Sequence, residues 1–263
     1  MSLNTKYLFR QLLSTLEINV ICDIGSMDGT DALAFRRRSR DSSIYAFEPN
    51  PENFRAMQAN QHLHAAHIEM IPCALAERDG AAPFYLVKAD YSQISARRGM
   101  SSLHERSGEH APHQVVQVPT MRLDSFMNAR KPEPRLRLAL WIDTEGAAFE
   151  VIQGSTGIAQ SIQLLHVEVE TVRCIGQKQR IYAEVRQLLL ELGFAEVGND
   201  RIRSNIQFNA LFLRRNLPLR LRLRAQAQIA RTHCRQLLIR ALGALCPACL
   251  RHLKLALKTH HVH

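Results

Sequence analysis

The first residues able to do chemistry follow a short apolar segment, residues 20–24. Asp23 lies near its end, and two glycines four positions apart, Gly25 and Gly29, come directly after it. Glycine allows a sharp backbone turn or the close approach of a ligand. A helix-like segment begins at Thr30, and its first amides would favour a carboxylate or phosphate at the same place. The spacing differs from the GxGxxG of dinucleotide sites, so this motif alone leaves both a cofactor site and a structural turn open.

An acidic residue after the next strand-like segment favours a nucleoside as the ligand of this motif. Glu48 follows residues 43–47 and stands twenty-five positions after Asp23. In open α/β sheets an acid at this place accepts hydrogen bonds from ribose hydroxyls. The glycine turn and the acid together predict a cofactor that contains a nucleoside.

A second set of carboxylates follows two later strand-like segments. Asp143 and Glu145 lie on the loop that leaves one segment, and Glu168 and Glu170 lie at the end of the next. Because the carboxyl ends of parallel strands meet at one edge of a sheet, we expect these acids to border one crevice. Carboxylates so close together perturb one another's pKa or hold a hard cation. For any single one of them, capping a helix or facing solvent is the alternative.

The rest of the chain supplies the elements that position these groups. A chain of 263 residues can bury roughly 70–75% of its unfolded surface. Strand-like and helix-like segments alternate before residue 215, which predicts an α/β fold with a largely parallel sheet and helices on both faces. A turn at Asn199 and Asp200 predicts a hairpin between the last two strands, so that one strand is antiparallel. The predicted strands are 20–24, 43–47, 67–73, 83–87, 115–119, 138–142, 163–169 and 207–213, and the predicted helices are 4–16, 30–38, 51–60 and 181–192.

A long polar segment, residues 91–113, interrupts this alternation and is rich in Ser, Arg and His. Such segments in compact domains are usually lids, binding loops or disordered stretches. Our hypothesis is that it closes over the bound molecules, with Arg97 and Arg98 facing an anionic or sugar-like substrate. A solvated basic loop is the alternative.

Several blocks of the sequence resemble class I S-adenosylmethionine-dependent methyltransferases of the FkbM family. The resemblance covers about residues 18–214, through CDIGSMDGT, YAFEPNPENF, CALAERDG, MSSL, MRLDSF and WIDTEGAAFEVIQG. It implies a Rossmann-like three-layer sandwich with a seven-stranded, mostly parallel sheet whose last strand is antiparallel. It also implies S-adenosylmethionine as cofactor and methylation of a hydroxyl on a small molecule, sugar or glycan.

The resemblance also implies roles for individual residues. The cofactor residues are Asp23, Gly25, Ser26 and Gly29 on the methionine side, Glu48 at the ribose, and Cys73 and Ala74 near the adenine. The catalytic residues are Asp143, Glu145 and Glu168, and the substrate-facing residues are Arg97, Arg98, Ser101 and Ser102. A divalent cation is compatible with this set but not required by it.

Two positions depart from the family pattern. Trp141 stands where the family usually has Lys, and Ala148 stands where Glu is common. If that Lys polarises the acceptor, an Arg from residues 91–110 must replace it. A non-catalytic cofactor-binding protein that recruits partners is therefore an alternative function, and an RNA methyltransferase is another.

Positive charge is concentrated in the C-terminal part of the chain. The net charge is +10, and residues 201–263 hold thirteen of the 34 Lys and Arg but none of the 24 Asp and Glu. We expect an N-terminal helix (1–17), a methyltransferase domain (18–215) and a basic tail (216–263) of two amphipathic helices broken near Pro247. For the tail we rank packing within a homo-oligomer first, an anionic membrane surface second and nucleic acid third, because no aromatic residue for base stacking follows Phe212.

The remaining sequence features concern compartment and cysteines. The N-terminus lacks the apolar core of a signal peptide and no run reaches a membrane-spanning length, so we expect a cytoplasmic protein, with the tail able to touch the inner face of the membrane. Cys22, Cys73 and Cys174 lie in or beside apolar runs and are expected to be small buried hydrophobes. The Cys246-x-x-Cys249 pair favours helix packing over metal binding, because no second ligand pair accompanies it.

Overall fold

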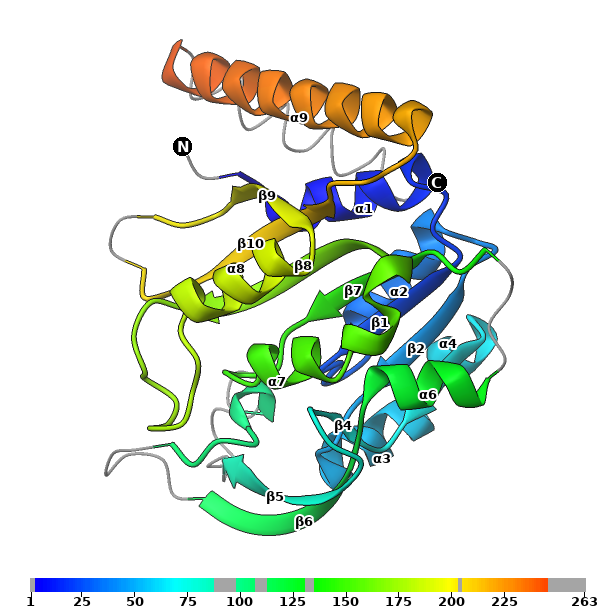
Figure 1. Cartoon of the computed structure of the whole chain (residues 1–263), viewed down its shortest axis with the longest axis vertical. Helices are drawn as coiled ribbons and strands as arrows, with labels where there is room; N and C mark the ends of the chain where they lie inside the picture. The colour runs from blue at the N-terminus through cyan, green and yellow to red at the C-terminus, as the bar shows by residue number, and fades with distance from the viewer. Residues whose placement is uncertain (1–2, 88–97, 107–112, 131–134, 203–204, 246–263) are drawn as a thin grey trace.

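The computed structural model of the chain is a layered α/β structure (Figure 1). It describes residues 3–87, 98–106, 113–130, 135–202 and 205–245. Arg97, which was predicted to face the substrate, and the predicted helix break near Pro247 lie outside these residues.

A seven-stranded sheet forms the centre of the described part, with the order β3-β2-β1-β7-β8-β10-β9. Neighbouring strands are parallel, except that β10 runs antiparallel to both β8 and β9. This is the predicted sheet with one antiparallel strand, and the predicted hairpin joins β9 to β10. The strands are β1 (Val20–Ile24), β2 (Ser43–Phe47), β3 (Ile68–Ile71), β7 (Leu138–Ile142), β8 (Ile162–Glu170), β9 (Phe194–Asn199) and β10 (Gln207–Arg214).

Alternate residues of the central strands supply two separate cores. In β7, Leu138, Leu140 and Ile142 belong to one apolar cluster, and Ala139 and Trp141 belong to the other. Because helices cover both faces, β7 and β1 are buried at every position, as expected for parallel strands. The first face is covered by α6 (Leu123–Ala129), α7 (Ala148–Gln153), η3 (Thr156–Ser161) and α8 (Tyr182–Glu191), and the second by α1 (Thr5–Thr15), α2 (Thr30–Arg38), α3 (Pro51–Ala59) and α4 (Gln61–Ala65).

Three further strands form a small sheet beside the main one, in the order β4-β6-β5. The strand predicted over residues 67–73 is wrong beyond Ile71. Pro72 has no N–H to donate to a ladder, so β3 ends before it and the chain enters the other sheet. The strands predicted at 83–87 and 115–119 are confirmed, and they pair with each other. The bounds are β4 (Ala74–Leu75), β5 (Gly80–Val87) and β6 (His113–Met121).

A long helix, α9 (Leu219–Leu245), packs on α1 outside the sandwich (Figure 1). Leu217, Leu221 and Ala225 are buried against the core on the α1 side. The first helix predicted for the tail is therefore confirmed. No helix in the described part of the chain is long and apolar enough to cross a membrane.

Ion pairs between α9 and the body are exposed. Arg220 and Arg224 lie 3.1 and 3.5 Å from the carboxylate of Glu17. Exposed pairs of this kind stabilise a protein by about 0–1 kcal/mol each. The buried apolar side chains, rather than these pairs, therefore hold α9 in place.

The cysteine expectations are confirmed in part. Cys22 and Cys73 are buried, as predicted, but Cys174 is exposed. The expectation for Cys174 was wrong because β8 ends at Glu170, so the cysteine lies on the loop that follows the apolar strand.

Candidate active site

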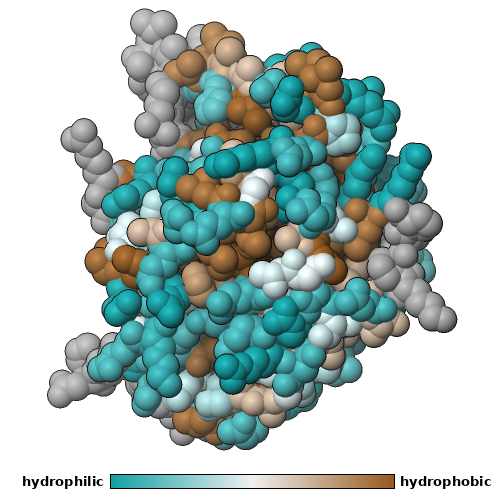
Figure 2. All heavy atoms as spheres, viewed as in Figure 1, coloured by the Kyte–Doolittle hydropathy of each residue, from teal (hydrophilic) through white to brown (hydrophobic). Residues whose placement is uncertain are grey.

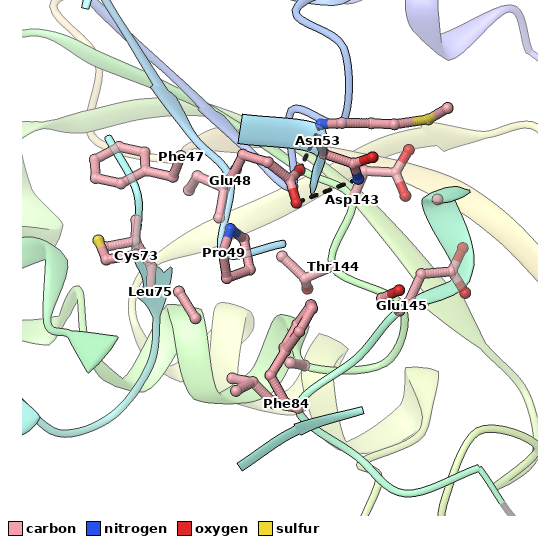
Figure 3. A pocket seen from close by; sticks show the side chains of 18 of the residues that line it. Phe47, Glu48, Pro49, Asn53, Cys73, Leu75, Phe84, Asp143, Thr144 and Glu145 are labelled. Carbon is pink, nitrogen blue, oxygen red and sulfur yellow. Dashed lines mark hydrogen bonds between the residues drawn. The ribbon is translucent and has the colours of Figure 1, made fainter. Parts of the chain in front are cut away.

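A hollow opens at the carboxyl ends of β1, β2, β7 and β8, and Figure 3 shows it from close by. The space inside it that water-sized molecules can reach is about 180 Å³. The small sheet and η2 (Arg98–Met100) supply the remaining wall. The predicted site residues that line it are Gly25, Glu48, Cys73, Ala74, Ser101, Asp143, Glu145 and Glu168.

The glycine turn brings the end of β1 against the loop after β7. Gly25 has a φ of 83°, and a Cβ placed there would lie 1.8 Å from the carbonyl oxygen of Asp143. Gly29 has a φ of 79°, and a Cβ there would lie 2.6 Å from the side chain of Leu63 on α4. Both glycines thus permit close packing between elements, and of the two only Gly25 also lines the hollow.

Asp23 and Ser26 are buried and do not line the hollow. The Ser26 hydroxyl donates a hydrogen bond of 2.6 Å to the Asp23 carboxyl. Burial raises the pKa of Asp23 to about 8, so this carboxyl is largely protonated at neutral pH. These contacts stabilise the glycine turn from outside the lining of the hollow. A direct contact of either residue with a cofactor stays a prediction.

Glu48 directly follows β2, with its side chain directed into the hollow (Figure 3). Its carboxylate accepts hydrogen bonds from the backbone amides of Met27 at 2.7 Å and Asn50 at 2.9 Å. Met27 has a φ of 54°, a strained conformation for a residue with a side chain. Burial raises the pKa of Glu48 to about 7, although both amides favour its ionised form. Oε1 also accepts from the Asn53 side chain at 3.4 Å, so Oε2 is the oxygen that keeps a lone pair for a further donor.

One wall of the hollow is apolar. Phe47, Cys73, Leu75 and Phe84 converge there (Figure 3). Burial raises the pKa of the Cys73 thiol to about 11, so the sulfur is neutral and belongs to this wall. A flat heteroaromatic ring suits such a surface.

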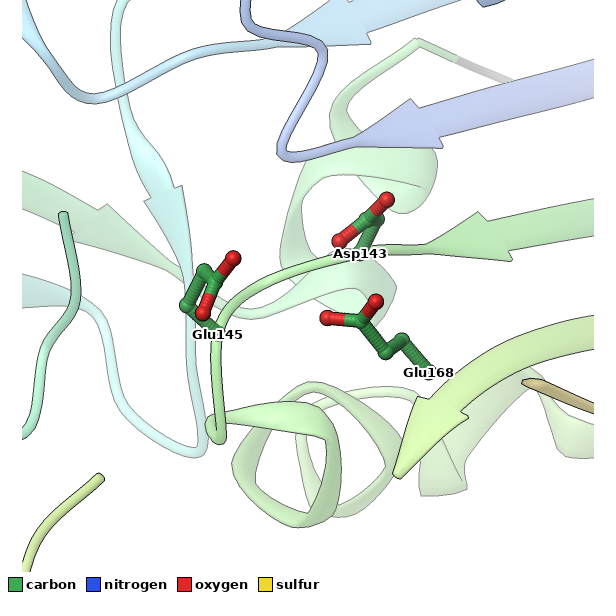
Figure 4. Close-up of side chains that lie close together, drawn as sticks. All are labelled: Asp143, Glu145 and Glu168. Atoms are coloured by element: carbon green, nitrogen blue, oxygen red, sulfur yellow. The ribbon is translucent and has the colours of Figure 1, made fainter. Parts of the chain in front are cut away.

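Three carboxylates gather on the opposite side. Oxygen atoms of Asp143, Glu145 and Glu168 lie within 4.8 Å of one another (Figure 4). Burial raises the pKa of Asp143 and of Glu168, and a hydrogen bond joins the two carboxyls. We therefore assign one shared proton to this pair. A hard cation would relieve the same repulsion between like charges, so the set is compatible with a cation without requiring one.

Glu145 differs from the other two because a cation already accompanies it. The Arg106 guanidinium lies 2.5 Å from the Glu145 carboxylate, and their side chains are only 15% and 17% exposed. Burial raises the pKa of Glu145 to about 7, while the charge of Arg106 opposes this rise. Glu145 has a φ of 51°, and a residue held in this region stores about 1–3 kcal/mol of strain. Arg106 is thus an arginine of the polar segment that contacts a residue of the lining, and its replacing the family Lys stays a prediction.

Ser102 fastens the described part of the polar segment to the site. Its hydroxyl donates to the Glu145 carbonyl at 2.6 Å and accepts from the His104 amide at 3.0 Å. Its backbone exchanges hydrogen bonds of 2.8 and 3.2 Å with Tyr85 on β5. These contacts give Ser102 a positioning role rather than a place in the lining of the hollow.

The other predicted residues of this region are placed as follows. Ser101 lines the hollow, and its hydroxyl accepts a hydrogen bond of 3.2 Å from the Val87 amide. Arg98 begins η2. Glu170 is buried outside the lining, where the Gln179 side chain donates to it at 2.6 Å.

The two departures from the family pattern leave the hollow unchanged. Trp141 faces the α1 side of the sheet, where its ring stacks on His166 with 3.7 Å between centroids, and Phe9 and Phe35 pack beside it. Ala148 begins α7 and is buried in the other core. Neither residue lines the hollow.

Among the lining residues that sequence reasoning missed are Asn53, Phe84 and Thr144. The Asn53 amide donates to Glu48 at 3.4 Å. The Thr144 hydroxyl is buried without a partner among the described residues, and its place between Asp143 and Glu145 was a usable signal. Phe84 gave no such signal, because it reaches the hollow only through the small sheet.

The fold and the site define a class of protein. β10 is inserted antiparallel between β8 and β9, and an acid at the end of β2 faces a glycine turn after β1. This combination is that of a class I methyltransferase. The profile of the Methyltransferase FkbM domain matches residues 23–195, and the chain belongs to this family.

Curated relatives match part of the chain. Methyltransferase 1 of Beauveria bassiana is 29% identical over 143 residues, 51% of this chain and 57% of that protein. Hexuronic acid methyltransferase AglP of Haloferax volcanii is 27% identical over 58% of this chain and 56% of its own length. 2-O-methyltransferase NoeI of Sinorhizobium fredii is 26% identical over 60% of this chain and 67% of its own. The chain thus spans a little over half the length of the first two.

Among solved structures, an rRNA methylase from Streptococcus thermophilus superposes with a TM-score of 0.44 and 11% identity, over 81% of this chain and 98% of its own. This is a general likeness of fold, and nothing about the substrate follows from it.

Proposed function

We propose that this protein is an S-adenosylmethionine-dependent O-methyltransferase that acts on a hydroxyl of a sugar or glycan. One observation carries the proposal: a single hollow joins the buried Glu48 to the carboxylates Asp143, Glu145 and Glu168. Membership of the FkbM family supports the reaction class.

The residues of the hollow fit the cofactor. Glu48 is only 4% exposed yet lines the space, and its Oε2 keeps a lone pair that a ribose hydroxyl can use. Phe47, Cys73 and Leu75 offer an apolar surface for the adenine. When bound, the cofactor supplies an electrophilic methyl group.

The carboxylate side fits a hydroxyl acceptor. Glu145 has a pKa of about 7 and is close to half ionised at neutral pH, so it is the residue we assign to removing the acceptor proton. Such a base contributes about 10²- to 10⁴-fold to the rate. Arg106 holds Glu145 in place, and positioning of the acceptor can lower the barrier by up to roughly 7–11 kcal/mol.

The acceptor class is supported by the names of two relatives. One is called a hexuronic acid methyltransferase and the other a 2-O-methyltransferase. We extend a sugar hydroxyl from them to this chain as part of the proposal.

Calorimetry tests the cofactor half. S-adenosylhomocysteine should bind the wild-type protein, and Glu48→Gln should weaken binding by about 10- to 100-fold, since charge-assisted hydrogen bonds are lost. Glu52→Gln is the matched control, because Glu52 is an exposed acid in the first turn of α3. Absence of binding by the wild type would sink the proposal.

Transfer of a labelled methyl group tests the acceptor half. Uronic acids, neutral sugars and an RNA oligonucleotide are offered with and without a chelator and Mg²⁺. Labelling of sugars supports the proposal. Labelling of RNA alone favours the RNA methyltransferase, and binding without transfer to any acceptor favours the non-catalytic protein.

A further inference from the structure

The outward side of α9 carries an unusual row of exposed leucines. Leu219, Leu223, Leu237 and Leu238 are 61%, 56%, 45% and 63% exposed. At 100° per residue they fall within one sector of about 100°, and at 1.5 Å per residue the row is about 28 Å long. Figure 2 shows brown apolar residues among teal ones at the top of the molecule, where α9 lies.

This row is a second apolar face of the helix. The first face contains Leu221 and Ala225, which are buried against the α1 side of the core. A helix that only covers a globular core needs one apolar stripe. The exposed Ala227, Ala230 and Cys234 lie between Leu223 and Leu237 in the same sector, so the opposite side carries an apolar strip. Such a strip indicates a surface that binds something.

Arginines border the exposed row on both sides. Arg224 and Arg231 lie along one border, and Arg222 lies along the other. All three are exposed, and in the described part of the chain Arg222 and Arg231 form no ion pair. Residues 201–263 contain no Asp or Glu that could neutralise them.

The exposed arginines indicate which binding partner fits the outward face of α9. A second copy of the chain, docked through the same face, would bring its own arginines against these. Residues 246–263 of the chain carry Arg251, Lys254 and Lys258 and no acid, so the same repulsion applies to them. An anionic lipid surface satisfies both features, because it accepts leucines at the acyl boundary and arginines at the phosphates.

We propose that the outward face of α9 docks on a membrane surface that contains anionic phospholipid. Figure 1 places α9 at the opposite end of the molecule from β5, whose Phe84 lines the hollow, so docking through the outward face of α9 does not cover that side of the hollow. The inference is independent of the proposed chemistry.

Vesicle flotation of the full chain tests the proposal. The wild type should float with vesicles of phosphatidylglycerol and phosphatidylcholine, should float at least about tenfold less with phosphatidylcholine alone, and should be released by salt. Leu219→Gln, Leu223→Gln, Leu237→Gln and Leu238→Gln together should lower binding about tenfold or more. Arg222→Gln with Arg231→Gln should do the same.

The control variant Arg40→Gln with Arg78→Gln makes the same change of charge on exposed residues away from α9 and should bind as the wild type does. Circular dichroism and binding of S-adenosylhomocysteine report that each variant is folded. Three results would overturn the proposal: no flotation of the wild type, full binding by the leucine variant, or a dimer that only the leucine variant abolishes. Competition by RNA that depends on the arginines but not on the leucines would equally overturn it.

Discussion

Glu145 makes the acceptor side of the site sensitive to pH. Burial raises its pKa to about 7, and only the ionised carboxylate can accept a proton. Turnover at saturating cofactor should therefore rise with pH and level off above about 7. Glu145→Gln should lower turnover by about 10²- to 10⁴-fold and remove this rise. Initial rates across the neutral range provide the measurement.

Arg106 supplies the internal control for this assignment. Its positive charge lowers the pKa of Glu145, so Arg106→Gln should move the midpoint of the pH profile upward, whereas Arg106→Lys should keep it nearer to that of the wild type. An unchanged midpoint in Arg106→Gln would assign the titration to another group.

Asp23 should govern how stability depends on pH. Its folded-state pKa of about 8 exceeds the unfolded value of about 3.9. The folded state therefore holds a proton that the unfolded state releases, and stability should fall as pH rises from about 4 to about 8. Asp23→Asn mimics the protonated carboxyl and can still accept from Ser26.

Urea unfolding at mildly acidic and mildly alkaline pH measures this effect. The difference in stability between Asp23→Asn and the wild type should grow in favour of the variant as pH rises. If the free energies of unfolding of Asp23→Asn and of the wild type change by the same amount between the two pH values, the pKa assigned to Asp23 is wrong.

Residue types alone predicted a good part of the site. Asp143, Glu145, Glu168 and Glu170 were expected in one crevice because carboxyl ends of parallel strands share an edge, and all but Glu170 line one hollow together with Glu48. Asp23 and Ser26 were assigned to the cofactor through the resemblance to the family. They lie behind the turn because Asp23 shares the strand face of Ile21, which the α1 side of the core covers.

At the scale of elements, the loops after β1 and β7 meet at Gly25. Gly25→Ala should lower the free energy of unfolding by about 3 kcal/mol or more. The φ of Gly25 is 83°, and a Cβ there would lie 1.8 Å from the Asp143 carbonyl oxygen. Gly99→Ala is the matched control, since its Cβ would lie 3.4 Å from the Met27 sulfur and its φ is ordinary. That variant should cost less than about 1 kcal/mol. Chemical denaturation compares them, and equal costs would mean that the contact is not tight.

Elements were predictable where local pattern and burial agree. β1 and β2 were predicted with their observed bounds, since their apolar runs end at glycine and at Glu48-Pro49. The division of residues 67–75 between two sheets was not predictable. β4 has two residues and exists only because β6, forty-six positions further along, pairs with Ala74 and Leu75.

At the scale of the whole molecule, α9 should contribute to stability through its inward face alone. Leu221→Ala should cost about 2–5 kcal/mol, since Leu221 is fully buried in the core with α1. Leu223→Ala should stay within about 0.5 kcal/mol, because that side chain is 56% exposed. Thermal unfolding of the two variants provides the comparison, and similar losses would contradict the packing of α9.

The same contact changes how a truncation should be designed. Removal of residues 216–263 would separate the proposed tail from the proposed domain, but it would also uncover α1, whose Leu8 and Leu12 pack in the cluster that Leu221 completes. Substitutions on the outward face avoid this problem, and for that reason they carry the test of membrane docking.

The pairing of α1 with α9 has a consequence for synthesis. α9 is synthesised long after α1, and β10 must also arrive before β9 can join the sheet. Until α9 has emerged from the ribosome, the side of α1 that packs with Leu221 stays uncovered. We expect the nascent chain to engage a ribosome-associated chaperone during this interval and to complete its fold only after α9 has emerged.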